Sequence, residues 1–442
     1  MPCPSTRKTI GDGLTLLDPR LSILASLFPL THASPERLNE VRDSRLRRLV
    51  AHAYANVPYY RRLFDSAGVR PEHVRTAADL SRLPATSREQ FQGLPLEELT
   101  ARGVGRLRPL DTGGSSGRQI TVYWTGNELR LANAIRFREM WLHGWKPGYR
   151  MVRFYNRQRS GGVGLLLARL GLHMAILWAQ APAATHLERL QQLRPHHVHG
   201  YASYVTAVAM ACLERGVRLR PKMVVTSGDA LLEGQRRLVE QAFAADPVEI
   251  YSCNEAGDIA WQCRPQKRFH VNSEAIIVET LGEDAAPCDP GAMGEVTLTS
   301  LYHYAMPKIR YQPGDLAVLA NESCPCGNGH PTISALMGRR NEVIRLPDGD
   351  LITPIMFASL FRDYPRTQAY RLSQVSRTRL LLEVVAGPDL TPEALEQLRQ
   401  RVVMLSRGQV EVDALLVAGI PRALSGKQKL IHADPRGDEE PQ

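Results

Sequence analysis

The stretch that decides the fold runs from Met223 to Tyr251 and reads MVVTSGDALLEGQRRLVEQAFAADPVEIY. Two apolar runs, Met223–Thr226 and Val248–Tyr251, stand on either side of a segment with helical spacing at 231–244. Strands that alternate with helices of this length indicate a parallel sheet flanked by helices, so we predict an α/β fold. The alternation extends upstream, with strands expected at 151–155 and near Val198 and helices at 127–143, 186–193 and 203–216.

The chain is expected to divide into a large and a small part, because 442 residues are too many for one ordinary core. Short β segments follow from 269 to 320. Beyond a boundary near Gly338 the order is strand (379–385), helix (393–405) and strand (409–417), with Thr391 as the helix N-cap. Residues 1–40 indicate no clear element. The predicted parts are a large N-terminal domain at 1–337 with parallel sheets flanked by helices plus a β-rich subdomain, a hinge at 338–343, a small mobile α+β lid domain at 344–433, and a disordered tail at 434–442.

Composition excludes several classes of protein. Hydrophobic residues make up 43% of the chain and charged residues 23%, as in a soluble globular protein. The sequence contains no run of 18 apolar residues, so no membrane span is predicted. The N-terminus shows no apolar leader behind basic residues, so we expect a cytoplasmic protein. The net charge of +10 suits anionic ligands. The basic residues match no recognition motif for nucleic acid, and no such partner is expected.

A loop rich in glycine and hydroxyl groups precedes a predicted strand at 120–124. It reads DTGGSSGR from Asp111 to Arg118. Glycines bring backbone N–H groups close to an anion, hydroxyls add donors and the arginine adds charge, so the loop suits phosphates. The loop does not end in Gly-Lys-Ser/Thr, which excludes the P-loop of nucleoside triphosphatases. The alternative is that the loop is a plain turn without a ligand. The candidate phosphate-binding residues are Thr112, Gly113, Gly114, Ser115, Ser116, Gly117 and Arg118.

Two carboxylates and one lysine occupy positions suited to chemistry. Glu255 follows the strand that ends at Tyr251, at the edge where α/β sheets bind ligands, and is a candidate magnesium ligand beside a phosphate. Asp315 is presented by a Pro-Gly turn and is suited to accept both hydroxyls of a ribose. Lys427 follows a glycine and is placed to offer a point charge to a neighbouring domain. The alternatives are a helix cap or loop glutamate, a turn aspartate and a surface lysine.

Taken together these motifs resemble the pattern of the AMP-forming adenylating enzymes, and the chain looks like the phenylacetate–CoA ligase branch of that superfamily. The shared order is phosphate loop, carboxylate after Tyr251, Tyr-x-x-Gly-Asp, Gly-Arg boundary and terminal Gly-Lys. The resemblance covers roughly residues 45 to 430. Three further segments resemble the branch, namely Val57–Phe64, Leu83–Glu89 and Gly200–Tyr204.

The resemblance implies ATP and magnesium as cofactors and an acyl-AMP intermediate. It assigns catalysis to Lys427, Glu255 and Arg118, the phosphates to loop 112–118, and magnesium to Glu255. The adenosine would lie against Tyr251 and Asn254, with Asp315 on the ribose and Arg339 nearby. The carboxylic acid would contact residues near Tyr201, Tyr204, Ser227, Gly228 and Asp229. Aromatic residues there suit an aryl or arylacetic acid, and core packing is the alternative explanation for Tyr201 and Tyr204.

The chain departs from the family pattern at several places. In the phosphate loop Gly113 replaces a hydroxyl residue, Arg118 the lysine and Gln119 the proline. Asn254 stands where threonine is usual, Gln312-Pro313 where arginine and threonine are usual, and Asn341-Glu342 where two aspartates are common. The glycines, glutamate, aspartate and lysine at the chemically demanding places remain, so activity is expected.

The cysteines predict a separate metal site. The seven cysteines are an odd number in a chain that we expect to be cytoplasmic, which argues against a disulfide framework. Cys263 and His270 precede Cys324 and Cys326 by about fifty residues. Three thiolates and one imidazole form a closed tetrahedral set for a structural zinc ion, and a similar arrangement recurs in phenylacetate–CoA ligase-like chains. Free buried thiols are the alternative, and Cys253 and His330 are reserve ligands.

Three functions stay open at this stage. The first is ligation of the acid to CoA. The second is the same adenylation followed by transfer to an amine or to a carrier-protein thiol. The third is a nucleotide-binding protein without catalysis, against which the retained Lys427 and Glu255 argue. The sequence also leaves open whether the protein forms a homodimer.

Overall fold

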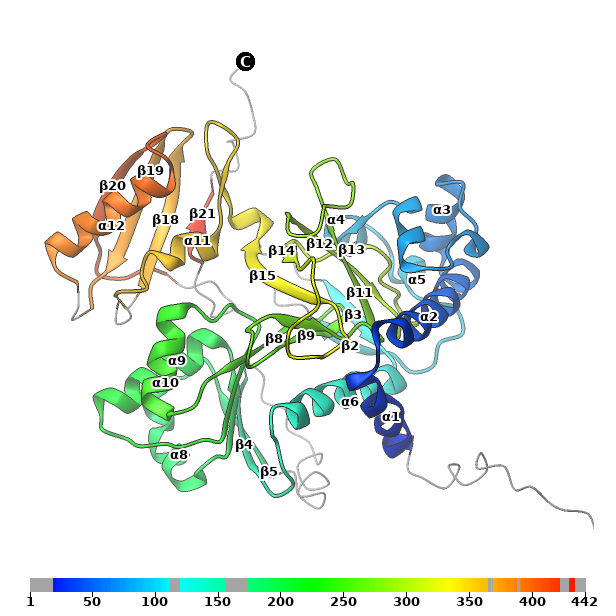
Figure 1. Ribbon diagram of the computed structural model, residues 1–442, viewed down its shortest axis with the longest axis horizontal. Helices are drawn as coiled ribbons and strands as arrows, with labels where there is room; N and C mark the ends of the chain where they lie inside the picture. The colour runs from blue at the N-terminus through cyan, green and yellow to red at the C-terminus, as the bar shows by residue number, and fades with distance from the viewer. Residues whose placement is uncertain are drawn as a thin grey trace, which may run out of the picture.

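The computed structural model describes residues 19–111, 120–155, 173–364, 367, 369–387, 390–421 and 429–433. The largest sheet among these residues has 13 strands (Figure 1). The strands of one half run parallel to one another, whereas those of the other half are mostly antiparallel. The parallel half follows the predicted alternation of strands and helices. Its strands, in spatial order, are β5 (His173–Trp178), β4 (Arg150–Tyr155), β6 (His197–Gly200), β7 (Met223–Ser227) and β8 (Val248–Cys253).

Helices cover both faces of the parallel strands, which explains their continuous apolar runs. On β7, Val224 packs into a cluster with residues of α8 (Leu187–Leu193), α9 (Ala202–Glu214) and α10 (Glu233–Phe243). Its neighbours Met223 and Val225 point the other way and pack with Met140 of α6 (Gly126–Leu142). The predicted α/β class, with a parallel sheet flanked by helices, is therefore confirmed.

The sheet continues without a break into its β-rich half. β8 pairs in parallel with β7 on one edge and antiparallel with β9 on the other, with Tyr251 opposite Ala260. The segment that carries Glu255 is the short turn between β8 and β9. The strands of this half are β9 (Gly257–Gln262), β10 (Phe269–Val271), β11 (Ile276–Leu281), β12 (Met293–Ser300), β13 (Tyr311–Gln312), β14 (Asp315–Leu319), β15 (Thr332–Arg339) and, next to β13, the short β1 (Thr86–Ser87).

An N-terminal helical layer packs on the β-rich half. Its largest cluster joins Leu46, Leu49 and Tyr60 to Val296 and Leu298 of β12. The first helices fall within residues 1–40, for which the sequence indicated no element. The elements are α1 (Pro19–Leu27), α2 (Pro35–Asn56), α3 (Pro58–Ser66), β1 (Thr86–Ser87), α4 (Arg88–Gln92), α5 (Leu96–Leu99), and the hairpin of β2 (Arg108–Asp111) with β3 (Thr121–Trp124).

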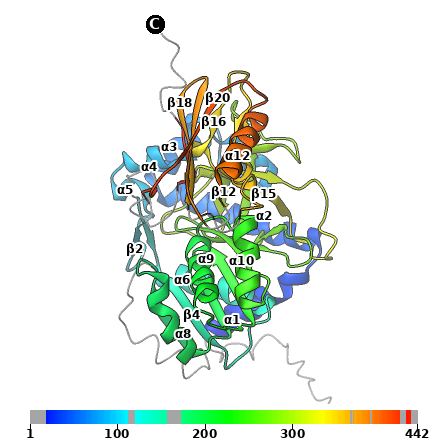
Figure 2. The same cartoon turned by 90° about the vertical axis from the view of Figure 1, so that its left-hand side faces the viewer.

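The C-terminal part has its own apolar core, which contains Ile344, Phe357, Leu382, Leu398 and Ile431. Its four-stranded sheet has the order β20-β19-β18-β21, and both views place it beside the ends of α9 and α10 (Figures 1 and 2). The Thr391 side chain accepts the N–H of Ala394, as the predicted cap requires. The elements are β16 (Ile344–Arg345), β17 (Leu351–Ile352), α11 (Pro354–Ser359), β18 (Ala369–Ser376), β19 (Arg379–Val385), α12 (Pro392–Leu405), β20 (Glu411–Leu416) and β21 (Ile431–His432).

Among the described residues, none of the helices combines the length and the apolar character that a bilayer crossing needs.

A buried histidine makes the stability of the protein sensitive to acid. His197 of β6 is fully buried, its ring nitrogens have no hydrogen-bond partner among the described residues, and burial lowers its pKa to about 3. Between that value and the ordinary value near 6.5 the unfolded chain binds a proton that the native state does not, so stability falls as pH falls. We expect His197→Leu to reduce the loss of unfolding free energy between pH 7.5 and pH 5 by about 2 kcal/mol. Urea denaturation at both pH values measures this, and equal losses in the two proteins would contradict it.

Candidate functional site

Three of the predicted nucleotide-binding residues meet at the junction of the two halves of the sheet. The Tyr251 hydroxyl donates to Asp315 Oδ2 at 2.8 Å, and Arg339 Nε lies 2.9 Å from Asp315 Oδ1. Asp315 and Arg339 are register partners on β14 and β15, so strand pairing fixes their contact. Burial and the Asp315 carboxylate raise the pKa of Tyr251, and Asp315 raises the pKa of Arg339. The phenol therefore stays protonated and acts as a donor.

Glu255 lies next to this group and is paired with an arginine that the sequence reasoning did not select. Its carboxylate is almost fully buried, and Arg88 Nη2 donates to its Oε1 at 2.7 Å. The Tyr311 hydroxyl donates to the same oxygen at 3.4 Å. The only signal for Arg88 was its place in the Leu83–Glu89 segment, which matched the family pattern without indicating a role.

His303 connects Glu255 to the strand that follows the phosphate loop. Its two ring nitrogens lie 2.9 Å from the Tyr123 carbonyl oxygen and 3.3 Å from the Glu255 carbonyl oxygen. Its ring also stacks on Trp124 with the centroids 4.0 Å apart. Burial lowers the pKa of His303 to about 4, so the ring is neutral at pH 7. The contacts tie β3 to the turn that carries Glu255.

The phosphate loop and the C-terminal lysine lie outside the described residues. This applies to Thr112, Gly113, Gly114, Ser115, Ser116, Gly117 and Arg118, and to Lys427. The flanks of the loop are described: Asp111 of β2 is paired with Thr121 of β3 in an antiparallel hairpin. The strand predicted to follow the loop is thus present. Asn254 is exposed in the turn beside Glu255.

The residues predicted to contact the acid have mostly structural contacts. The Tyr204 ring lies in the core of the parallel half, and its hydroxyl donates to the Ala181 carbonyl at 2.7 Å. The Asp229 carboxylate accepts the N–H groups of Ala202 and Ser203 at the start of α9. These contacts favour the core-packing alternative for Tyr204 and give Asp229 a structural task.

Tyr201, Ser227 and Gly228 lie at the carboxyl ends of β6 and β7 and are only partly covered or exposed. The Ser227 hydroxyl lies 3.0 Å from Nε2 of His199. Gly228 has a φ of +86°, and a Cβ there would stand 2.9 Å from the Tyr201 ring. A glycine is thus required for the half-buried Tyr201 ring to hold its place.

The structure brings Cys263, His270, Cys324 and Cys326 together. One ligand atom from each lies within 4.8 Å of the others. Nδ1 of His270 lies 3.4 Å from the His330 carbonyl oxygen, which leaves Nε2 facing the thiols, 3.3 Å from Sγ of Cys326. A backbone carbonyl on the second ring nitrogen is the usual support of a metal-ligating histidine. The donor set therefore fits a tetrahedral zinc site.

The two reserve ligands lie elsewhere. The ring nitrogens of His330 lie 3.0 Å from the Leu30 carbonyl oxygen and 3.0 Å from the Ser273 hydroxyl. Cys253 lies in the Glu255 region, where burial and that carboxylate raise its pKa. The cluster of four is thus the set that the fold assembles within the described chain.

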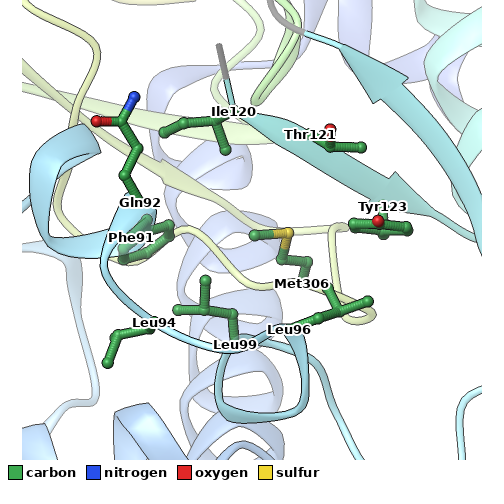
Figure 3. A pocket seen from close by; sticks show the side chains of 9 residues that line it. All are labelled: Phe91, Gln92, Leu94, Leu96, Leu99, Ile120, Thr121, Tyr123 and Met306. Atoms are coloured by element: carbon green, nitrogen blue, oxygen red, sulfur yellow. The ribbon is translucent and has the colours of Figure 1, made fainter. Parts of the chain in front are cut away.

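A cavity of about 470 Å³ opens between α4, α5 and β3 (Figure 3). Phe91 lines it from α4, the helix that begins at Arg88, and Met306 lines it from the segment before β13. None of the residues predicted to bind nucleotide or acid is among the lining residues, most of which are apolar. These are Phe91, Gln92, Leu94, Leu96, Leu99, Ile120, Thr121, Tyr123 and Met306.

Comparison with known proteins gives a consistent relationship. A phenylacetate-coenzyme A ligase of Thermus thermophilus is 27% identical over 406 residues, which cover 87% of this chain and 88% of that protein. The structure of a 2-hydroxyisobutyryl-CoA ligase in the postadenylation state aligns with a TM-score of 0.75 at 19% identity, over 92% of this chain and 91% of the other. The same ligase in the thioesterification state aligns with a TM-score of 0.60 at 19% identity, over 91% of both chains. No family model matches the chain.

The similarities extend along nearly the whole chain and agree with the motif order and the α/β architecture. The chain is therefore similar in sequence to phenylacetate-coenzyme A ligases and shares the fold of a CoA ligase.

Proposed function

We propose that the protein uses ATP to convert a carboxylic acid into an acyl-AMP and then transfers the acyl group to the thiol of CoA. The observation that carries this proposal is the meeting of Tyr251, Asp315 and Arg339 beside Glu255. A carboxylate on paired strands, next to a second carboxylate in a turn, offers a ribose contact and a magnesium contact at one place. The fold shared with CoA ligases supports the same assignment.

Nucleotide binding would use the residues at the end of the sheet. Asp315 would accept the ribose hydroxyls, while Arg339 and Tyr251 hold its carboxylate by one oxygen each. The adenine would lie on Tyr251 beside Asn254. Phosphates would contact the N–H groups and hydroxyls of loop 112–118, including Arg118. Glu255 would bind Mg²⁺, which neutralises phosphate charge when bound.

Acyl-AMP forms when the acid carboxylate attacks the α-phosphorus and pyrophosphate leaves. Negative charge grows on the phosphate oxygens in that step, and Lys427 from the small lid domain would neutralise it. A hinge at 338–343 would then turn the lid so that the CoA thiol meets the acyl-AMP. Gly338, the residue before the last one of β15, has a φ of +101°, and a Cβ there would stand 2.8 Å from Pro354 of α11. Glycine therefore permits the close junction between the large sheet and α11.

The acid would be aryl or arylacetic, with Tyr201 as its aromatic contact and Ser227 and Gly228 near its far end. These residues stand at the carboxyl ends of parallel strands, where α/β sheets bind ligands. Tyr204 and Asp229 would shape this region indirectly, through the core and the start of α9.

The cluster of Cys263, His270, Cys324 and Cys326 would hold a structural zinc ion. Without a metal, burial raises the pKa of Cys263 to about 12 and raises that of Cys324, so the thiols keep their protons. A bound cation would replace those protons and fix the loop between β14 and β15. That loop also contacts the N-terminal layer, since the Asn328 amide donates to the Thr31 carbonyl at 2.8 Å.

The zinc site predicts a metal content of about one equivalent per chain. We expect Cys263→Ala to lose the metal and to lower the melting temperature, because binding free energy contributes to folding. Cys288→Ala is the matched control, since Cys288 lies outside the cluster. Elemental analysis and thermal melts measure both effects. Less than about 0.2 equivalents in the unmodified protein, with all thiols titratable, would remove the site.

The function is tested by product analysis with a panel of aryl and alkyl acids, ATP and Mg²⁺. We expect AMP and an acyl-CoA when CoA is present. An amide with an added amine, or an acylated carrier protein, in place of the thioester would assign the second half-reaction to that acceptor. If none of the acids in the panel led to the formation of AMP, acid activation would be contradicted.

A further inference from the structure

Arg88 is held against Glu255 by the architecture around it. β1 pairs in parallel with β13, with Thr86 opposite Tyr311, and Arg88 is the next residue after β1. The side chains of Arg88 and Glu255 are 13% and 3% exposed, and they join a segment near the N-terminus to the turn after β8. Lys308 lies buried close by and donates to the Met306 carbonyl at 2.9 Å.

The pair has features of an exchangeable contact. A buried charge is costly when it has no partner, so Glu255 needs a cation whenever no ligand is present. Arg88 fills that need through one nitrogen, while its Nε is buried without a hydrogen-bond partner among the described residues. A guanidinium in a permanent site normally uses its planar fork in a bidentate way. Arg136 does so with Asp258, at 2.7 and 2.8 Å.

A divalent cation that binds Oε1 of Glu255 would meet Arg88 Nη2, which donates to the same oxygen at 2.7 Å. Two cations on one buried oxygen repel each other strongly. Binding of metal at Oε1 would therefore drive the guanidinium away from that oxygen. Once released, the guanidinium would lie near the phosphates of a nucleotide bound beside Glu255.

We propose that Arg88 is the resident counter-ion of Glu255 in the nucleotide-free protein and that the divalent cation bound with ATP displaces it toward the phosphates. This inference rests on the proposed function, because Glu255 must be the magnesium ligand. Arg88 is thus a positioning residue: it holds the carboxylate in place between turnovers, and it makes ATP binding less dependent on magnesium.

The test measures the dissociation constant of ATP by calorimetry without any acid, once with Mg²⁺ and once with EDTA. The magnesium dependence is the ratio of the constant in EDTA to that in Mg²⁺. In Arg88→Gln, ATP alone meets an unpaired Glu255, whereas Mg²⁺ no longer has a competitor. We expect the ratio to rise by at least about tenfold. Arg82→Gln, which changes an exposed arginine outside the site, is the control and should leave the ratio unchanged.

A structural role of Arg88 would raise both constants by the same factor, and an unchanged ratio would overturn the inference. Glu255→Gln provides a second, independent readout that remains valid if the arginine variant does not fold. It frees Arg88, so we expect metal-free ATP to bind about tenfold more tightly than in the unmodified protein. Equal or weaker binding would overturn the inference while the proposed function stands. Absence of any ATP binding in the unmodified protein would overturn both.

Discussion

Replacement of Lys427 by alanine is expected to abolish acid-dependent exchange of pyrophosphate into ATP. The lysine would face the charge that grows on the α-phosphate, and a fixed charge aimed at developing charge contributes strongly to catalysis. Removing one such group typically lowers the rate on the order of 10²–10³-fold. The same variant should still convert synthetic acyl-AMP and CoA into acyl-CoA, because that step would use another face of the lid domain.

The two half-reactions therefore separate the role of Lys427 from damage to the fold. Lys429→Ala is the matched control, since it removes a neighbouring positive charge from the same segment. It should retain exchange and thioester formation. Equal loss of both activities in Lys427→Ala would contradict the division of labour that we assign to the lid domain.

The second large effect is expected at Asp315. Asp315→Ala would remove the proposed acceptor of both ribose hydroxyls, and it leaves Arg339 without its carboxylate partner. Hydrogen bonds to a charged group contribute roughly 1.5–3 kcal/mol each, so kcat/KM for ATP should fall by about a hundredfold or more. Steady-state exchange kinetics with varied ATP measure this fall.

A milder variant distinguishes ribose binding from support of the strands. Tyr251→Phe removes only the hydroxyl that donates to Asp315 Oδ2, and the carboxylate keeps its contact with Arg339. We expect a loss of about tenfold or less in kcat/KM for ATP. If Asp315→Ala melts normally and exchanges at the unmodified rate, Asp315 does not bind the nucleotide.

Much of the fold could be predicted because its signals are local. The runs at Met223–Thr226 and Val248–Tyr251 are strands, and the helix with Thr391 as N-cap begins as its capping residue indicates. Residues 1–40 were harder. The Ser34 side chain caps α2 by accepting the N–H of Arg37, a signal present in the sequence, but α1 is apolar without a clear amphipathic period.

Part of the candidate site follows from turns and strand ends that present a side chain. Glu255 and Asp315 were selected by such local signals, and Tyr251 and Arg339 by the family resemblance; the four are neighbours in the structure. Arg88 and His303 were missed because their contacts join segments 167 and 180 residues apart, and no spacing rule connects them. Tyr204 shows the opposite problem, since an aromatic residue on a helix facing a sheet packs into the core.

The most direct measurement is pyrophosphate exchange into ATP by the unmodified protein across a panel of aryl, arylacetic and alkyl acids. The account predicts exchange that depends on both Mg²⁺ and at least one acid in the panel, and that is absent when the acid is omitted. If the protein binds ATP with Mg²⁺ and no acid promotes exchange, the carboxylates and the lid lysine do not converge on an activated acid.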